Sequence, residues 1–314
     1  VGRHMRVFVT GGAGFIGSHV CEKLLDHGAE VVAFDDFSTG STRVHGADIV
    51  EGDVRNLAEV VAAMSGCTHV AHLAAMASVP ASVANPSLSE AINLQGTLNV
   101  IEAAHQVGVK RIVFSSTAAV YGNATELPVT ESSVTQCQSP YAEDKLAAEI
   151  AILHSGIEAI SLRYFNVHGP RQDPNGAYAA VIPVFIQMLT ESKSPTIFGT
   201  GDATRDFVSV FDVADLNLKA LTTENEVALG EVFNVASGSS MSVLELFNTL
   251  REILSANHPE AQSVEPVFSP PRDGDILHSS ASIEKARELL GFDPETNPIQ
   301  ALSSTVEAYW ADQA

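Results

Sequence analysis

A glycine-rich turn placed directly after a strand-like run constrains this chain more than any other feature. Residues 5–10 are mostly apolar and β-branched, and Gly11-Gly12-Ala13-Gly14-Phe15-Ile16-Gly17 follows before an amphipathic helical pattern. Glycines at these spacings permit a tight turn, a close approach of the backbone to a pyrophosphate, and close packing of helix on strand. Because many ordinary βα turns carry two glycines, the surrounding sequence decides the interpretation.

An acidic residue stands where a dinucleotide-binding unit requires one. Asp35 ends a predicted strand at 30–35, 18 residues after Gly17, and its carboxylate would bond the adenosine ribose hydroxyls. Asp36 follows with no arginine directly after it, so a 2′-phosphate would face two carboxylates and be repelled. The sequence therefore favours NAD over NADP. Asp53 and Val54, after a third short strand, are expected to reach the adenine.

Short β-branched runs alternate with helical patterns through the first half of the chain. Strands are predicted at 5–10, 30–35, 69–73, 111–115 and 159–167, and helices at 16–27, 57–64, 88–107 and 140–154. Such alternation is typical of βαβ units. The predicted fold class is α/β, a Rossmann doubly wound parallel sheet with a smaller mixed α/β substrate lobe.

The pattern loosens after residue 168, where Pro, Gly, Asn and Ser interrupt it. We predict an NAD-binding domain at 1–168, with returning segments near 206–221 and 231–236. Strand-like runs at 206–210 and 231–236 mark this return, and the chain is mostly helical from residue 242 onward. Residues 169–205 and 237–314 are then predicted to form the substrate lobe.

Composition narrows the classes of partner. The chain has 17 Lys+Arg against 38 Asp+Glu, a formal net charge of −21, which opposes binding to nucleic acid or an anionic membrane surface. No apolar stretch runs for the roughly 18 residues of a membrane span. An anionic small substrate would have to be held by a few local arginines and backbone amides.

The three cysteines, Cys21, Cys67 and Cys137, show neither CxxC nor metal-ligand spacing. A disulfide framework and a metal site are therefore not expected, and a reducing, cytoplasmic location fits best. Residues 1–4 have the character of a tag remnant rather than a targeting signal.

Catalytic side chains are predicted at the carboxyl end of a strand and the start of the next helix. Ser115, Ser116 and Thr117 end the strand, while Tyr141 and Lys145 lie one turn apart on the same helix face. A tyrosine phenol has a pKa of about 10, and bringing it near 7 takes ~4 kcal/mol of differential interaction. The Lys145 ammonium and a positive nicotinamide would supply this together.

These motifs, with His72-Leu73-Ala74-Ala75 and the segment from Ser116 to Gly122, resemble the extended short-chain dehydrogenases/reductases. The resemblance is to the NAD-dependent epimerase/dehydratase family, and within it to the UDP-glucose and UDP-N-acetylglucosamine 4-epimerases, over nearly the whole chain. It implies an isomerase with Thr117, Tyr141 and Lys145 as catalytic residues. Tyr141 would remove the C4 hydroxyl proton, Thr117 would bond the same oxygen, and C4 would pass through a transient 4-keto sugar with NADH.

The resemblance also assigns binding residues. Those expected to bind NAD are Gly11, Gly14, Phe15, Ile16, Gly17, Asp35, Asp36, Asp53, Val54, Leu73, Ala74, Ala75, Asn93, Ser115, Tyr141 and Lys145. Those expected to bind the UDP-sugar are Ser78, Ser116, Thr117, Asn166, Ala180, Val181, Ile197, Gly199, Arg205, Arg272, Asp275 and Ser279. Among them Arg205 and Arg272 would bind the diphosphate, which guanidinium forks suit.

Two alanines separate this chain from other branches of the family. Nucleotide-sugar dehydratases carry Asp-Glu at Ala118 and Ala119, and UDP-glucuronate decarboxylases carry a glutamate at Ala119. An alanine cannot transfer a proton, whereas a 4-epimerase requires no acid or base there. A dehydratase, a decarboxylase, a UDP-uronate 4-epimerase and a catalytically idle NAD-sensing protein stay open as alternatives.

Ser279 bears on the choice of sugar. Relatives restricted to UDP-galactose carry a bulky tyrosine at this position beside the C2 group of the sugar, and a serine leaves room for an N-acetyl group. We therefore expect interconversion of UDP-GlcNAc and UDP-GalNAc, and of UDP-Glc and UDP-Gal as well. The resemblance further implies a homodimer formed through the Tyr141 helix and its neighbour. His168 departs from the family, which usually has Tyr or Phe there.

Overall fold

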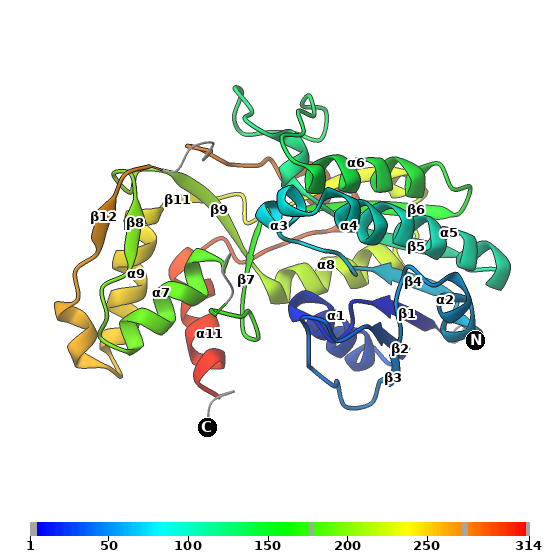
Figure 1. Cartoon of the computed structure of the whole chain (residues 1–314), viewed down its shortest axis with the longest axis horizontal. Coiled ribbons are helices and arrows are strands. Elements are labelled where there is room, and N and C mark those ends of the chain that lie inside the picture. The colour runs from blue at the N-terminus through cyan, green and yellow to red at the C-terminus, as the bar shows by residue number, and fades with distance from the viewer. Residues whose placement is uncertain (1–4, 176–178, 272–275, 312–314) are drawn as a thin grey trace.

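The computed structural model describes residues 5–175, 179–271 and 276–311 of the 314-residue chain. It consists of a larger lobe built on a seven-stranded sheet and a smaller lobe beside it (Figure 1). The sheet order is β10-β6-β5-β4-β1-β2-β3 and every pairing in it is parallel. Its strands are β1 Arg6–Thr10, β2 Glu30–Asp35, β3 Asp48–Glu51, β4 His69–His72, β5 Arg111–Thr117, β6 Glu158–Tyr164 and β10 Glu231–Val235.

The strands of this sheet are apolar because helices cover both of its faces. All seven residues of β5 are buried, as are the last four of β1. Strand order reverses between the adjacent strands β1 and β4, because β2 and β3 continue the sheet on the β1 side whereas β5 and β6 continue it on the β4 side. In open α/β sheets ligands bind outside the carboxyl ends of the strands at such a reversal, and the glycine-rich turn follows β1 at that edge.

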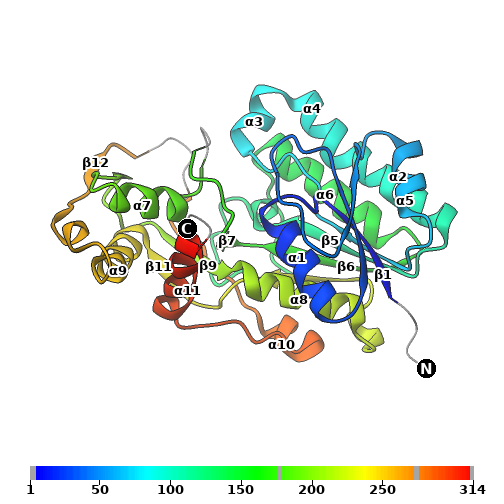
Figure 2. The ribbon, with the colours of Figure 1, turned by 90° about the horizontal axis from the view of Figure 1, so that it is seen from below.

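Two helical layers and two apolar cores sandwich the sheet (Figure 2). One core joins the sheet to α1, α8 and α10, and the other joins it to α2, α5 and α6. These helices are α1 Phe15–Asp26, α2 Leu57–Met64, α5 Gly96–Val107, α6 Pro140–Leu153, α8 Val210–Thr222 and α10 Glu284–Leu290. The short α3 Val79–Ala84 and α4 Pro86–Glu90 lie near α6.

The smaller lobe has its own core. Ile186, Leu189, Phe247, Leu250 and Leu302 are all buried in it, on helices α7, α9 and α11. The lobe holds a three-stranded sheet, β11-β9-β7, and a two-stranded sheet, β12-β8. Its elements are β7 Asn166–His168, α7 Val181–Thr190, β8 Thr196–Phe198, β9 Thr204–Ser209, β11 Ser240–Ser242, α9 Val243–Ser255, β12 Val267–Ser269 and α11 Pro298–Ala311.

The predicted fold class is confirmed, and three predicted elements need correction. Residues 159–167 are two strands, because the chain leaves the large sheet at Phe165, whose N–H donates to Val235 O at 3.0 Å. The helix predicted at 88–107 contains a π-helical segment, η1 Ala91–Gln95. The run at 206–210 belongs to β9, which pairs in the small sheet. The domain division stays a prediction, although Ala281 and Ala286 pack in the core beneath α8.

No helix in the described residues is long and apolar enough to cross a bilayer.

His168 connects the two small-lobe elements β7 and α11. Its Nδ1 lies 2.8 Å from Thr305 Oγ1, and its side chain is buried. Burial lowers its pKa from 6.5 to about 4. Since the pKa in the folded protein is below that in the unfolded chain, protonation favours unfolding. His168 therefore contributes stability above pH 6.5 that is lost as the pH falls towards 4.

We expect His168→Phe to remove this part of the pH dependence. The loss it abolishes is about 3 kcal/mol between pH 7 and pH 4, from the pKa difference. Free energies of unfolding measured in urea across this range should rise in the variant relative to the native chain as the pH falls. Parallel curves for the two proteins would show that His168 does not titrate in this way.

Candidate active site

The glycine-rich turn lies at the carboxyl end of β1 and leaves no room for side chains. A Cβ on Gly11, where φ is +69°, would stand 2.9 Å from Ala74 N, and one on Gly17 would stand 1.9 Å from Gly11 O. A Cβ on Gly14 would meet only Gly11 O, at 3.2 Å, and its other side is open. Gly14 is also the N-cap of α1 and has no capping side chain. The turn therefore fits a pyrophosphate at the start of α1.

Asp35 and Asp36 stand at the end of β2, and both accept local hydrogen bonds. The Asp35 carboxylate accepts from Ala13 N and Phe37 N, each at 2.9 Å, so it ties the end of β2 to the glycine turn. Burial raises its pKa. Asp36 accepts from Ser38 N and Ser38 Oγ at 2.9 and 2.6 Å.

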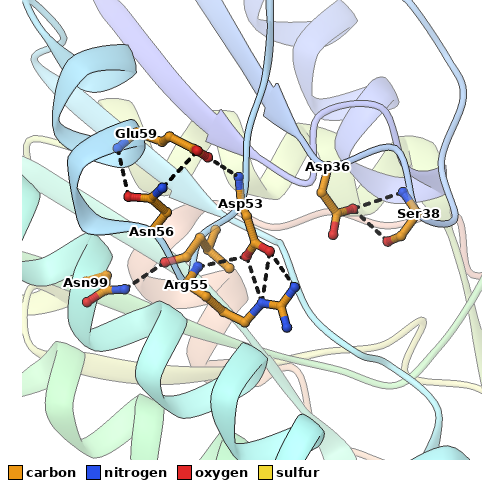
Figure 3. Close-up of polar contacts among 8 residues, drawn as sticks. Asp36, Ser38, Asp53, Arg55, Asn56, Glu59 and Asn99 are labelled. Atoms are coloured by element: carbon orange, nitrogen blue, oxygen red, sulfur yellow. Dashed lines mark hydrogen bonds and ion pairs between the residues drawn. The ribbon is translucent and has the colours of Figure 1, made fainter.

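Asp53 lies beside Arg55, a residue that the sequence patterns did not single out (Figure 3). The Arg55 guanidinium donates Nε and Nη2 hydrogen bonds to the Asp53 carboxylate, which lowers the pKa of that carboxyl. Val54 is buried and its carbonyl accepts from Asn99 Nδ2 at 2.9 Å. This arginine offers a flat cationic surface next to the position expected for the adenine.

Residues 73–76 follow β4 as coil and approach the glycine turn. Leu73 N and Ala74 N donate to Thr10 Oγ1, each at 3.0 Å. Asn93, in the π-helical segment, accepts from Met76 N at 2.9 Å through Oδ1. The structure thus brings Leu73, Ala74 and Ala75 to the same edge as Gly11, and places Asn93 behind them.

Thr117 and Tyr141 meet at the centre of the candidate site. Thr117 ends β5 and its Oγ1 accepts from Ala119 N at 3.1 Å, which leaves its own proton free to donate. Tyr141 stands at the start of α6, where Ser139 is the N-cap. Burial raises the pKa of Tyr141, and its hydrogen bond with the Thr117 side chain lowers it. In this state Tyr141 is a neutral phenol at pH 7.

Lys145 is buried one turn further along α6. Its Nζ lies 4.1 Å from the centre of the Phe114 ring, a cation–π geometry. Burial lowers the pKa of Lys145 to about 7, and the charge of Glu149 opposes that shift. Glu149 is itself buried and bonds Arg163 at 2.5 Å and Ser161 at 2.9 Å.

The predicted serines of β5 differ in their partners. Ser115 Oγ donates to Tyr164 Oη at 2.9 Å, and Asn217 Nδ2 donates to the same oxygen at 2.7 Å. Ser116 Oγ is buried with no hydrogen-bond partner. A buried hydroxyl without a partner is costly unless a ligand completes it, so Ser116 and the open side of Gly14 both fit a bound cofactor and substrate.

One cavity of about 310 Å³ brings many of the predicted residues together. It is lined by Thr117, Tyr141, Asn166, Arg205 and Ser279, together with Ala118 and Ala119. Asn166 Nδ2 donates to Asp206 O at 3.0 Å, and Arg205 Nη1 donates to Thr204 O at 2.8 Å. An acidic or basic side chain at position 118 or 119 would face this cavity, and this chain has alanine at both positions.

The other predicted substrate residues lie around the smaller lobe and α3. Ser78 is the N-cap of α3, Ala180 is the N-cap of α7, and Val181 begins that helix. Ile197 is buried in the lobe core, and Gly199 makes a turn with φ +73° after β8. Arg272 and Asp275 lie outside the described residues.

Several cavity residues were missed by the sequence analysis. Tyr121, Leu127, Tyr164, Phe165 and His278 all line the space next to Tyr141. Tyr164, Phe165 and His278 adjoin Asn166 and Ser279 in sequence, which is the one available signal. Tyr121 and Leu127 come from the segment between β5 and α6, whose path no pattern predicts.

Within the described part of the chain, no three His, Cys, Asp or Glu side chains cluster as a metal site would require.

Comparison with known proteins decides the family. The model described as the NAD dependent epimerase/dehydratase family matches residues 7–236. This chain belongs to that family. The predicted NAD-dependent epimerase, an isomerase, is thereby confirmed, and NAD is its cofactor.

Three relatives of this epimerase-family protein illustrate the match. A protein of Methanocaldococcus jannaschii named as a putative UDP-glucose 4-epimerase is 38% identical over 309 residues, covering 96% of this chain and 97% of its own. The UDP-glucose 4-epimerase of Thermotoga maritima, solved with UDP-glucose, is 35% identical with a TM-score of 0.91, covering 99% and 100% of the chains. The UDP-N-acetylglucosamine 4-epimerase of Methanobrevibacter ruminantium, solved with UDP-N-acetylmuramic acid, is 34% identical with a TM-score of 0.90 and covers 100% of both.

We expect Glu149→Gln to lower the free energy of unfolding by about 3 kcal/mol, because it leaves the buried Arg163 charge without its counter-ion. The matched control is Glu284→Gln, which breaks the exposed pair with Arg287 on α10 and should cost no more than about 0.5 kcal/mol. Urea denaturation of the three proteins measures both values. Equal losses in the two variants would argue against a structural ion pair beneath Lys145.

Proposed function

We propose that this protein is a UDP-hexose 4-epimerase that accepts UDP-GlcNAc and UDP-GalNAc as well as UDP-Glc and UDP-Gal. The observation that carries the proposal is the composition of one cavity. It is lined by Thr117, Tyr141 and Ser279, with alanines at positions 118 and 119. Proton exchange at a single sugar hydroxyl is the chemistry that this set of side chains supports.

In the proposed reaction the Tyr141 oxygen takes the proton of the C4 hydroxyl and later returns it. The Thr117 oxygen accepts from Ala119 N, so its proton is available to donate to the C4 oxygen of the sugar and would stabilise the charge that develops there. Bound NAD supplies a hydride acceptor and donor at C4. The sugar is then a 4-ketone, which can be reduced on either face.

Burial governs the proton transfer. Burial raises the pKa of Tyr141 and lowers that of Lys145 to about 7, so in the protein without cofactor burial opposes the charged form of both groups. A phenolate forms readily only when positive charge stands nearby. Lys145 supplies one charge, its protonated form being favoured by Glu149 one turn away. The positive nicotinamide ring is the second.

An epimerase must hold the nucleotide while the 4-keto sugar turns over. In this proposal Arg205 and Asn166 bind the diphosphate and the sugar side, because both line the cavity on the smaller lobe. Ala180 and Val181 would contribute backbone groups at the start of α7. The roles of Arg272 and Asp275 stay predictions from the family resemblance.

A direct assay tests the function. Purified protein is incubated with UDP-GlcNAc and, separately, with UDP-Glc, and products are resolved by anion exchange or NMR. C4 epimers from both sugars are expected. Absence of a C4 epimer from either sugar would refute the proposal. A 4-keto-6-deoxy product would select a dehydratase. In a parallel incubation with UDP-glucuronate, released carbon dioxide would select a decarboxylase and a C4 epimer a uronate epimerase.

Tyr141→Phe should reduce turnover at least about 10³-fold, since general acid–base catalysis supplies 10²–10⁴, while NAD binding stays nearly unchanged. Turnover is followed with UDP-Glc, and cofactor content by release of bound NAD on denaturation. An unaffected turnover would exclude Tyr141 as the base. The same variant distinguishes an enzyme from an NAD-sensing protein, which would show no turnover to lose.

Ser279→Tyr should discriminate between sugars. The larger side chain fills cavity volume beside Tyr141, so kcat/KM for UDP-GlcNAc is expected to fall at least about 100-fold, and that for UDP-Glc less than about tenfold. Ser279→Ala, which adds no bulk, is the matched control and should preserve the native preference. Equal losses for the two sugars would show that this position does not sense the C2 group.

The homodimer and the cytoplasmic location also stay predictions. Ile150 on α6 is 51% exposed and Leu98 on α5 is 39% exposed, so neighbouring helices present apolar side chains at the surface. These are the helices through which the family resemblance implies pairing.

A further inference from the structure

The cofactor strip, defined as residues 73–76, is held by side chains in addition to one backbone bond to the sheet, from Leu73 N to Thr10 O at 3.2 Å. It is coil, and it begins where β4 ends. Thr10 Oγ1 accepts from Leu73 N and Ala74 N, each at 3.0 Å, at one end of the strip. At the other end the Asn93 side chain bonds Met76 twice, accepting from its N–H at 2.9 Å and donating to its carbonyl at 3.3 Å. The strip is therefore fixed at two points.

The Thr10 hydroxyl determines whether one ring nitrogen of His72, Nδ1, carries a hydrogen. A hydroxyl has two acceptor sites and one proton, and in Thr10 both acceptor sites are taken by the strip amides. The remaining proton points to His72 Nδ1, 2.6 Å away. Nδ1 must therefore be the bare, accepting nitrogen of the ring.

The protonation state of the other ring nitrogen, Nε2, is determined independently by Thr97. Thr97 Oγ1 donates its proton to Asn93 O at 2.7 Å, because a carbonyl can only accept. His72 Nε2 lies 2.9 Å from the same Thr97 oxygen, so Nε2 must donate to it. Both ends of the chain of hydrogen bonds assign the same neutral tautomer, with hydrogen on Nε2 alone.

The surroundings of His72 also oppose a second proton. The ring is completely buried and lies 5.6 Å from the Phe114 ring, whose other neighbour is the Lys145 ammonium. Burial and the Lys145 charge lower the pKa of His72 to about 3. The ring is therefore neutral at neutral pH.

We propose that His72, held as the Nε2–H tautomer, is a positioning residue for the cofactor. It joins the cofactor strip to the π-helical segment η1 through Thr10 on one side and Thr97 on the other. The proposal rests on NAD binding at this edge of the sheet and is independent of which sugar is epimerised.

The same network reaches the catalytic helix. Asn93 Nδ2 donates to Ser89 Oγ at 3.2 Å, and Ser89 Oγ donates to Asp144 Oδ2 at 2.6 Å. Asp144 directly precedes Lys145 on α6. The cofactor strip and the helix that carries Lys145 are therefore connected through Asn93 of the π-helical segment η1 and Ser89 of α4. Asn93 serves both connections, because its carbonyl accepts from Thr97 on α5 and its side chain bonds Met76 and Ser89.

The tautomer itself is the first test. In ¹⁵N-labelled native protein, long-range proton–nitrogen NMR should give a pyrrole-type shift at Nε2 and a pyridine-type shift at Nδ1 for His72, assigned by comparison with His72→Gln. Hydrogen on Nδ1, or rapid exchange between the two forms at neutral pH, would overturn the proposal. This measurement needs neither substrate nor turnover.

The second test uses a residue that touches no part of the cofactor strip. Thr97→Val keeps the shape but removes the partner of Nε2, whereas Thr97→Ser keeps the hydroxyl and serves as the matched control. Loss of one buried hydrogen-bond partner is worth 1–3 kcal/mol. If it loosens the strip, the dissociation constant for NAD should rise about tenfold in Thr97→Val and less than about threefold in Thr97→Ser.

Titration calorimetry of cofactor-stripped proteins gives these constants, and KM for the UDP-sugar at saturating NAD should not change. Equal NAD affinity in the two variants would overturn the positioning role. If Thr97→Val does not fold, Thr97→Ala against Thr97→Ser poses the same question, because alanine also removes the partner of Nε2. Because NAD affinity is measured without substrate, failure of this inference stays distinguishable from failure of the proposed epimerase activity.

Discussion

The structure depends on how closely the backbone at Gly11 approaches the backbone after β4. A side chain at Gly11 would have its Cβ 2.9 Å from Ala74 N, so the contact exists only with glycine there. This approach joins the carboxyl ends of β1 and β4, the two strands at which the sheet order reverses. That contact positions the binding edge and the strip behind it. It also positions the next strand, which ends in Thr117.

Burial is the second influence on the candidate site, because it disfavours the charged forms of the side chains there. Tyr141, Lys145 and His72 all shift towards their neutral forms. The protein therefore keeps a weakly charged reaction centre until a positive cofactor ring arrives. One buried ion pair, Glu149 with Arg163, lies one helical turn below and is the exception. Its carboxylate provides the opposing field that keeps the lysine within reach of protonation.

Sequence reasoning located the parts of the site that lie on one element. The glycine turn, Asp35, and the i, i+4 pair of Tyr141 and Lys145 are local patterns, and each depends on spacing within a strand, turn or helix. The fold class followed from alternation. Ala118 and Ala119, which lack an acid or base, could also be placed at the candidate site, because they directly follow a strand.

The parts that could not be predicted depend on contacts between distant elements. Residues 159–167 show no turn signal, yet the chain passes at Phe165 from β6, beside β10 of the large sheet, to β7, which pairs with β9 about 40 residues further along. The π-helical turn has no sequence period that distinguishes it from an α-helix. His72 gained a specific role only when Thr10 and Thr97, from two other elements, were found at its two nitrogens. Arg55 beside Asp53 is a different case, a local pair two residues apart that no pattern singled out (Figure 3).

The place of β10 in the sheet has a consequence for how the protein is made. β10 pairs with β6, although the chain first builds β7, β8 and β9 in the smaller lobe between them. During synthesis the free edge of β6 must therefore wait, unpaired, until residue 235 has left the ribosome. Open strand edges template aggregation. The nascent chain is thus most vulnerable while its smaller lobe is being translated, when α6 already packs on β5 and β6 but the other face of the sheet still lacks α8.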